Sequence, residues 1–242
     1  MLSKTQFNGV SVIDLSKVPR ANFLEGDFGK EALKEFKERV VLDYYGNISL
    51  DKLYFENGVV EGSNPFAVVL INQILPEGMR VATQADLETI LKTSALDLSG
   101  TYEDSALVLR NTKGFDEYLA IDLDEQIKQR FPKRKIKYPV MVPLASLELV
   151  NDSNAFFKLA FKLKEDAKVI YAPQLTNENN GDSFSKTNKN GLPIFNYDGK
   201  RTSRIIVCNL SRLNLDKNLN LSSGWVNLAD SDCFGRVVVL SY

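Results

Sequence analysis

The chain has 242 residues, of which 44% are hydrophobic and 25% are charged, and its formal net charge is −1. This is the composition of a globular protein that buries its core without disulfides or metals, and the balanced charge gives no general attraction to nucleic acid or membrane. The chain contains no histidine. Ser-His-Asp and Cys-His catalysis and histidine-ligated zinc or iron sites are therefore excluded.

Targeting and redox signals are equally sparse. The first residues carry a lysine but no apolar run of signal-peptide length, and residues 66–71 form the longest strongly apolar run. We therefore expect a soluble protein of the cytoplasm or of a virion, not secreted by a signal peptide. Cys208 and Cys233 indicate a reducing compartment without a disulfide framework. Whether the two cysteines are close is left open.

Charge is sorted along the chain. Residues 51–127 hold fourteen acidic against five basic side chains, a net of −9, and residues 128–242 hold ten acidic against eighteen basic, a net of +8. Opposite signs cancel within one fold, or they leave an acidic and a basic face that suit contact between copies.

Residues 1–138 read as an α+β part. Apolar spacing predicts an amphipathic helix over residues 30–45, with Leu33, Phe36 and Val40 on its buried face. Asn57-Gly58 predicts a type I′ turn in a hairpin over 53–62. Asn64 and Pro65 predict the N-cap and first residue of a helix over 66–75, which is apolar nearly all round and hence buried on every side.

Short apolar runs define the next predicted segments. Thr83 and Asp86 predict a capping box before a helix whose apolar residues follow at helical spacing. The runs at 105–110 and 117–123, on either side of Thr112-Lys113-Gly114, predict a hairpin of two strands. A short helix over 124–130 is expected to follow.

Residues 139–242 read as a β-rich part, antiparallel and sandwich- or barrel-like. Alternation predicts a half-buried strand over 157–163, and apolar runs predict strands at 169–171, 204–210, 213–221 and 236–240. A polar loop is expected over 177–191. The boundary near 138–150 divides two parts that are either separate or share one core.

The candidate interaction residues are a basic cluster and three side chains of the polar loop. They are Lys128, Arg130, Lys133, Arg134, Lys135, Lys137, Asn179, Asn180 and Phe184. Six positive charges on a proline-broken segment favour a solvated surface or a protein contact, with a phosphate backbone as the alternative. No catalytic, cofactor or metal-binding residue is assigned, because the acidic groups at 122–125 are better explained as a strand end and a helix start, and those at 230–235 as a turn between strands.

The stretch LPEGMRVATQADLETIL, residues 75–91, resembles the LP-x-G-W-R-L-P-T-x-x-E-W corner of the C-type-lectin-like fold. Pro76, Gly78, Arg80 and Thr83 match the motif. Met79, Ala82 and Leu87 replace its tryptophan, proline and second aromatic residue. The end of the chain, FGRVVVLSY, is similar to the closing strand of that family, which implies a ligand- or receptor-binding protein.

The abundance of asparagine and lysine, the absence of histidine and the many short strands resemble virion structural proteins of tailed phages. The resulting hypothesis is a non-enzymatic structural protein of a neck, tail or capsid-associated assembly, without a cofactor. Other protein subunits, in homo-oligomers and hetero-assemblies, are the expected partners, and no membrane contact is expected. A C-type-lectin-like binder is the alternative, and an enzyme that uses only carboxylates is the third hypothesis.

Overall fold

The computed structural model of the chain describes residues 4–7, 10–13, 20–110, 116–132, 136, 138–167, 170–171, 182–183, 209–223 and 227–242. The helices in this part are α1 (Gly26–Leu42), α2 (Pro65–Ile74), α3 (Gln84–Thr93), α4 (Glu117–Arg130) and the 3-10 turn η2 (Leu144–Ser146). The N-terminal strands are β1 (Lys4–Phe7), β2 (Val10–Ile13), β3 (Arg20–Phe23), β4 (Tyr54–Glu56), β5 (Val59–Glu61), β6 (Met79–Val81) and β7 (Tyr102–Arg110). The remaining strands are β8 (Val140–Pro143), β9 (Leu147–Asn151), β10 (Leu159–Leu163), β11 (Ile170–Tyr171), β12 (Asp182–Ser183), β13 (Asn209–Leu215), β14 (Asn220–Ser222), β15 (Gly235–Arg236) and β16 (Val238–Ser241).

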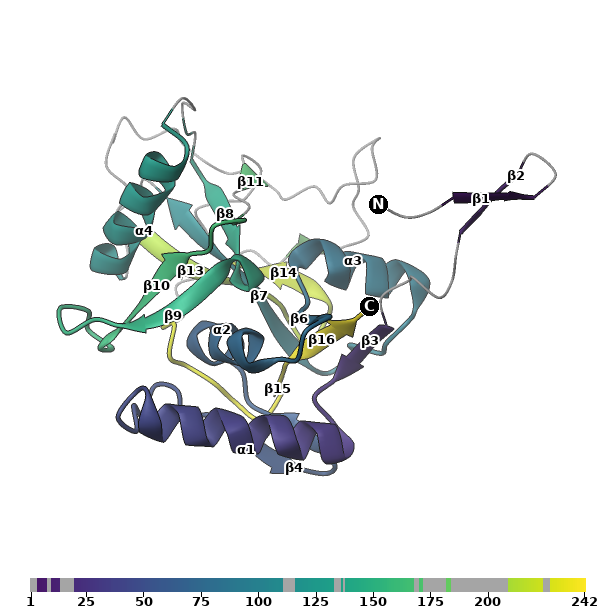
Figure 1. Cartoon of the computed structure of the whole chain (residues 1–242), viewed down its shortest axis with the longest axis horizontal. Coiled ribbons are helices and arrows are strands. Elements are labelled where there is room, and N and C mark those ends of the chain that lie inside the picture. The colour runs from purple at the N-terminus through teal and green to yellow at the C-terminus, as the bar shows by residue number, and fades with distance from the viewer. Residues whose placement is uncertain are drawn as a thin grey trace.

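The predicted α+β class, with antiparallel sheets in the C-terminal half, is confirmed. The largest sheet has the order β11-β8-β7-β13-β14-β12, and β15 pairs in parallel with β7. A second sheet joins β3, β16 and β6, and β9–β10 and β4–β5 are hairpins. Strand β7, from the predicted N-terminal part, thus lies between β8 and β13 from the C-terminal part (Figure 1).

The main core lies between this sheet and the helices. Helix α2 lies between α1 and the large sheet, and it contacts α1, β7 and β9 (Figure 1). Its residues from Pro65 to Ile71 are all buried, as its uniformly apolar sequence predicts. The side chain of Asn64 accepts a hydrogen bond from the Ala67 amide at 2.8 Å, which confirms the predicted N-cap.

Two further local predictions are confirmed. Asn57 and Gly58 have φ values of +50° and +86°, as a type I′ turn requires, and they join β4 to β5. Thr83 and Asp86 form the capping box of α3. Helix α3 then packs Leu87 and Ile90 into a smaller apolar cluster with β16.

Two predictions of strand were wrong. Residues 117–123 belong to α4, whose buried residues Leu119, Leu123 and Ile127 recur every four residues, so the predicted hairpin partner of β7 and the short helix from 124 are replaced by one helix. The predicted strand over 213–221 is two strands, because Leu219 adopts φ +62° in the turn between β13 and β14.

Candidate interaction surface

The predicted interaction residues are only partly placed by the structure. Lys128 and Arg130 lie in the last turn of α4, whereas Lys133, Arg134, Lys135, Lys137, Asn179, Asn180 and Phe184 lie outside the described residues. Lys128 forms an ion pair with Asp124 at 2.6 Å, and Arg130 donates to the Lys164 carbonyl at 3.4 Å. The charge of Lys128 is therefore partly neutralised within its own helix.

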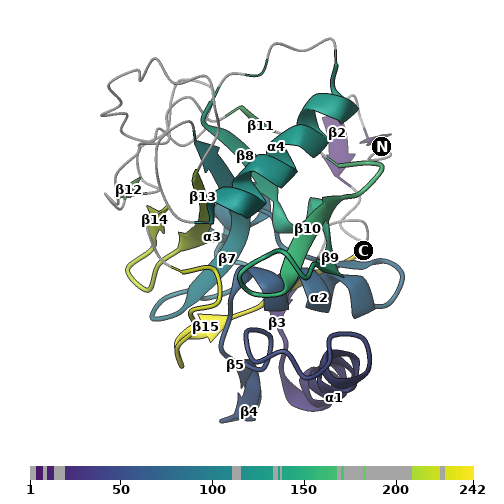
Figure 2. The same cartoon turned by 90° about the vertical axis from the view of Figure 1, so that its left-hand side faces the viewer.

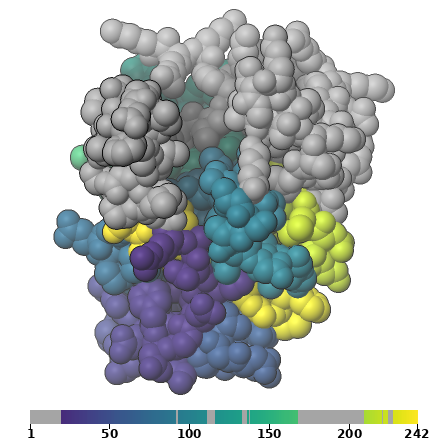
Figure 3. Space-filling model, turned by 90° about the vertical axis from the view of Figure 1, so that its right-hand side faces the viewer, coloured from purple at the N-terminus to yellow at the C-terminus, as the bar shows by residue number. Residues whose placement is uncertain are grey.

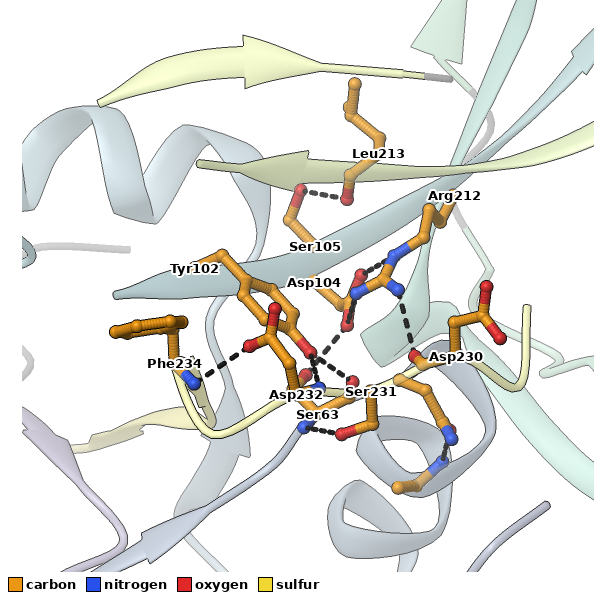
Figure 4. A network of polar contacts seen from close by, with 12 residues as sticks. Ser63, Tyr102, Asp104, Ser105, Arg212, Leu213, Asp230, Ser231, Asp232 and Phe234 are labelled. Carbon is orange, nitrogen blue, oxygen red and sulfur yellow. Dashed lines mark hydrogen bonds and ion pairs between the residues drawn. The ribbon is translucent and has the colours of Figure 1, made fainter. Parts of the chain in front are cut away.

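A network of buried polar side chains lies on the paired strands β7 and β13 of the large sheet. Arg212 of β13 makes two hydrogen bonds of 2.6 Å to the carboxylate of Asp104 on β7, and it donates a third, of 3.0 Å, to the Asp230 carbonyl (Figure 4). Ser63 donates its hydroxyl to Asp104 at 2.7 Å. Burial opposes the charge of Arg212, but the Asp104 carboxylate outweighs it and raises the pKa of the guanidinium.

Tyr102 extends this network to the C-terminal loop. Its hydroxyl donates to the Ser63 carbonyl at 2.8 Å and accepts the Asp232 amide at 3.1 Å, and its ring lies 5.1 Å from the Arg212 guanidinium (Figure 4). Ser63, Asp104 and Arg212 are each less than 5% exposed. The network is thus closed to solvent, and its chemistry is that of a structural clamp between residues 61–64, the sheet and residues 229–235.

Glu103, adjacent in sequence, is a second buried acid. Thr101 donates to its Oε1 at 2.5 Å, while its Oε2 has no hydrogen-bond partner among the described residues. Burial raises the pKa of Glu103 to about 8, with a smaller contribution from the charge of Asp104. The side chain is therefore largely protonated at neutral pH, which removes the cost of an uncompensated buried charge.

The corner at residues 75–91 is stabilised by an ion pair between side chains and by contact with the C-terminal residue. Arg80 of β6 pairs with Asp86 through contacts of 2.5 and 2.9 Å, and it donates to the Tyr242 hydroxyl at 2.6 Å. Burial opposes ionisation of Asp86, but Arg80 and Thr83 together keep its pKa below the ordinary value. The two segments that carry the C-type-lectin resemblance lie side by side, because β6 pairs with β16.

Neither acidic stretch assembles a metal site in the part of the chain that the structure describes, where no group of three or more potential ligands converges. Asp122, predicted at a strand end, lies within α4 and accepts a hydrogen bond from Gln126, and Asp232 accepts one from the Phe234 amide in the predicted turn. Within the same residues, no helix has the length and apolar character needed to cross a bilayer.

The clearest surface feature is an exposed set of large apolar side chains, which we call the apolar band. Ten such side chains are exposed among the described residues, and seven of them come from three neighbouring segments. The band consists of Val41, Leu42, Tyr45, Ile48, Tyr118, Ile121 and Phe156. Tyr45 and Phe156 are each 86% exposed, which is costly for side chains of this size unless something covers them.

Hydrogen bonds fix the three segments beside one another. Asn47, after α1, donates to the Phe157 carbonyl at 2.8 Å, and Asn151 donates to the Asp43 carbonyl at 2.8 Å. On the other side, Tyr118 of α4 donates to Asp152 at 2.7 Å. The tip of the β9–β10 hairpin, residues 152–158, therefore lies between the end of α1 and the start of α4.

The band occupies one side of the molecule. The end of α1, the hairpin tip and α4 lie together on the left of Figure 1, the side that faces the viewer in Figure 2. The opposite side, seen in Figure 3, is formed by other segments, and there β3 and β16 lie between α3 and the start of α1 (Figure 1). Phe234 and Tyr242, exposed elsewhere, each have a cation over the ring, from Lys217 and Arg80.

Charged side chains border both ends of the band. At the α1 end lie three ion pairs, Lys34–Glu38, Lys37–Asp51 and Arg39–Asp43, together with the exposed Glu31 and Glu35. Helix α4 and the hairpin tip carry the acidic side chains Glu117, Asp122, Glu125 and Asp152, with Lys158 on the tip and Lys128 and Arg130 in the last turn of α4. Burial raises the pKa of Asp122, and the charges of Asp152 and Glu125 raise it further.

The sequence contains a signal for the α1 part of this band. In the helix over 30–45, Val41, Leu42 and Tyr45 lie off the face defined by Leu33, Phe36 and Val40. Apolar residues on the polar side of an amphipathic helix indicate a second contact. The contribution of Phe156 and Tyr118 has no such signal, because only the tertiary structure places these residues beside α1.

No protein-family model matches the sequence, and comparisons with curated proteins and with solved structures also found no match.

Proposed function

We propose that this protein is a non-enzymatic structural subunit of a multi-component assembly, of the neck, tail or capsid-associated kind found in phage virions. The apolar band supports the assembly role most strongly, because side chains as large and as exposed as Tyr45 and Phe156 are typical of protein–protein contacts. The virion setting is supported by the composition: no histidine, abundant asparagine and lysine, and many short strands.

The non-enzymatic part of the proposal has its own support. Asp104 and Ser63, an acid and a hydroxyl at the centre of the polar network, are buried and hydrogen-bonded to each other, so a substrate does not reach them. A catalytic acid pair requires accessible carboxyl groups on either side of a reacting bond. Turnover of any substrate by the purified chain would contradict this part.

Light scattering on the purified chain tests the assembly role. We expect a mass above the 27.2 kDa of one chain, rising with concentration. The triple variant Leu42→Ser, Tyr45→Ser, Phe156→Ser should remain at the mass of one chain with an unchanged melting temperature. Tyr54→Ser, which removes an exposed aromatic side chain outside the band, is the matched control and should self-associate like the parent.

A C-type-lectin-like binder is the second candidate function. The pairing of β6 with β16 favours it, because the two segments that resemble that family are neighbours in one sheet. Binding of the purified chain to a glycan array, lost in Arg80→Ala but kept in the band triple variant, would support this candidate. A blank array combined with self-association through the band would favour the assembly role instead.

A further inference from the structure

We propose that Arg236 is a proton-controlled latch, which tethers the turn over residues 232–235 while Glu103 is neutral and releases it when Glu103 loses its proton. This latch belongs to the fold of the single chain and does not depend on the proposed assembly function. Strand β15 pairs in parallel with β7, and this register places Arg236 directly beside Glu103. The partners of these two side chains determine what the loss of the proton changes.

Arg236 holds the turn through one of its terminal nitrogens. Its Nη1 donates to the carbonyls of Cys233 at 2.7 Å and Gly235 at 2.8 Å. Its Nη2 donates to the carboxylate of Glu61 on β5 at 3.0 Å, and both side chains of this ion pair are largely buried. Within the turn, the Gly235 amide donates to the Asp232 carbonyl at 3.2 Å. The two bonds from Nη1 therefore tie the turn to an anchored guanidinium.

Glu103 has an acceptor to offer to that same nitrogen. Its Oε1 accepts the Thr101 hydroxyl at 2.5 Å, whereas its buried Oε2 has no hydrogen-bond partner among the described residues. Burial raises the pKa of Glu103 to about 8, and the charge of Arg236 acts in the opposite direction. The guanidinium is thus already close enough to favour the ionised form of this carboxyl group.

Loss of the proton to solvent changes what Arg236 binds best. An ionised Glu103 is a buried charge, which is costly until a cation compensates it. A hydrogen bond between two ionised groups is also stronger than one from a guanidinium to a neutral carbonyl. Nη1 therefore turns from the two carbonyls of the turn to Oε2 of Glu103, while Nη2 stays on Glu61. One guanidinium then serves two carboxylates, and the turn loses its tether.

Arg236 is the cation that is placed to compensate this charge. The ammonium group of Lys217, after β13, lies over the Phe234 ring at 5.2 Å, and Arg212 is bound to Asp104. The other ionisable side chains described on the elements around Glu103 are acidic and bring no positive charge. They are Asp104 of β7, Glu61 of β5, Glu88 of α3 and Asp216 after β13.

The release is confined to the turn. The Asp232 amide still donates to the Tyr102 hydroxyl, and the Tyr102 amide still donates to the Phe234 carbonyl at 3.0 Å, because neither bond involves Arg236. The side chains of Cys233 and Phe234 are exposed on this turn. The latch therefore controls how rigidly the surface presents a thiol and an aromatic ring.

Hydrogen–deuterium exchange of the full chain, read by mass spectrometry on a peptide that covers residues 230–236, tests the latch. The rate at each pH is divided by the rate of the same peptide without structure, which removes the intrinsic effect of pH. We expect this ratio to rise at least about tenfold from about pH 6 to about pH 9 in the parent chain, since the turn opens locally. It should stay flat in Glu103→Gln, which keeps the shape of the neutral acid. Glu56→Gln, an exposed neutralisation on β4, is the control and should follow the parent.

Arg236→Lys gives a second, independent test. One ammonium group does not reach Glu61 and two carbonyls together with the geometry of a guanidinium, so the turn should exchange rapidly at both pH values. A flat ratio in the parent, a rise that persists in Glu103→Gln, or slow exchange in Arg236→Lys would each overturn the latch. None of these results bears on the assembly role, which light scattering tests separately.

Discussion

Arg212 and Asp104 are 108 residues apart in the chain and form a bidentate ion pair. Both of its hydrogen bonds are 2.6 Å long, and both residues are at most 4% exposed. The pair joins β7 to β13 at the centre of the large sheet. Buried pairs of this kind owe their importance to the charge that would remain if one partner were lost.

We therefore expect Asp104→Asn to destabilise the fold by about 3–5 kcal/mol, because it leaves Arg212 buried without its countercharge. The double variant Asp104→Leu, Arg212→Met, which removes both charges, should recover much of that loss. Urea unfolding followed by circular dichroism measures both. A single variant within about 1 kcal/mol of the parent would show that the pair is accessible to solvent.

Glu103 predicts an unusual dependence of stability on pH. Its pKa of about 8 in the folded state exceeds the ordinary value of 4.5, so the folded state keeps a proton that the unfolded state releases between these values. The free energy of unfolding should fall as pH rises through this window, by on the order of 4 kcal/mol if other groups are unchanged. The stabilisation that the folded state gains from this retained proton is complete below pH 4.5 and is lost by about pH 8.

Glu103→Gln should remove this slope and should unfold at a higher urea concentration than the parent near the upper end of the window. Glu56→Gln, an exposed neutralisation on β4, is the control and should keep the slope. The prediction accounts for the neighbouring charges, because Asp104 raises the pKa of Glu103 and Arg236 lowers it. Parallel slopes for Glu103→Gln and the parent would contradict it.

Gly235 tests how closely the C-terminal segment approaches the clamp. A Cβ atom at this position would lie 2.5 Å from the Ser63 amide nitrogen and 2.7 Å from the Tyr102 hydroxyl. Gly235→Ala should therefore cost about 1–3 kcal/mol through displaced backbone. Gly100→Ala, whose Cβ meets nothing within 4 Å but whose φ is +80°, should cost about 1 kcal/mol. Equal thermal stabilities for Gly235→Ala and the parent would disprove the close approach.

Asn64 does more than cap α2. Besides accepting the Ala67 amide, its side chain donates to the carbonyls of Ser49 at 2.9 Å and Ala229 at 3.3 Å, and it is fully buried. We expect Asn64→Ala to cost about 2–4 kcal/mol, against about 1 kcal/mol for Thr83→Ala at the partly exposed cap of α3. Denaturant unfolding of both variants makes the comparison. A smaller loss for Asn64→Ala would mean that water replaces the missing amide.

Short apolar runs gave the least reliable predictions. The run at 117–123 predicts a strand, because seven residues are too few to distinguish the two-residue period of a strand from the 3.6-residue period of a helix. The helical period of Leu119, Leu123 and Ile127 emerges only when the charged residues that follow are included. The strand predicted over 213–221 failed because a four-residue turn, in which Asp216 accepts the Asn218 amide, interrupts an otherwise apolar pattern.

By itself the sequence determined what depends on neighbouring residues: the Asn57-Gly58 turn, the Asn64 cap, the Thr83–Asp86 capping box and the buried character of α2. These features follow from local dihedral preferences and from hydrogen bonds that span a few residues. Only the tertiary structure decided that Asp104 meets Arg212, and that residues 41–48, 118–121 and 156 form one surface. Several of these contacts join residues more than a hundred positions apart. Strand order and packing therefore determine which residues meet, and no local sequence pattern encodes that.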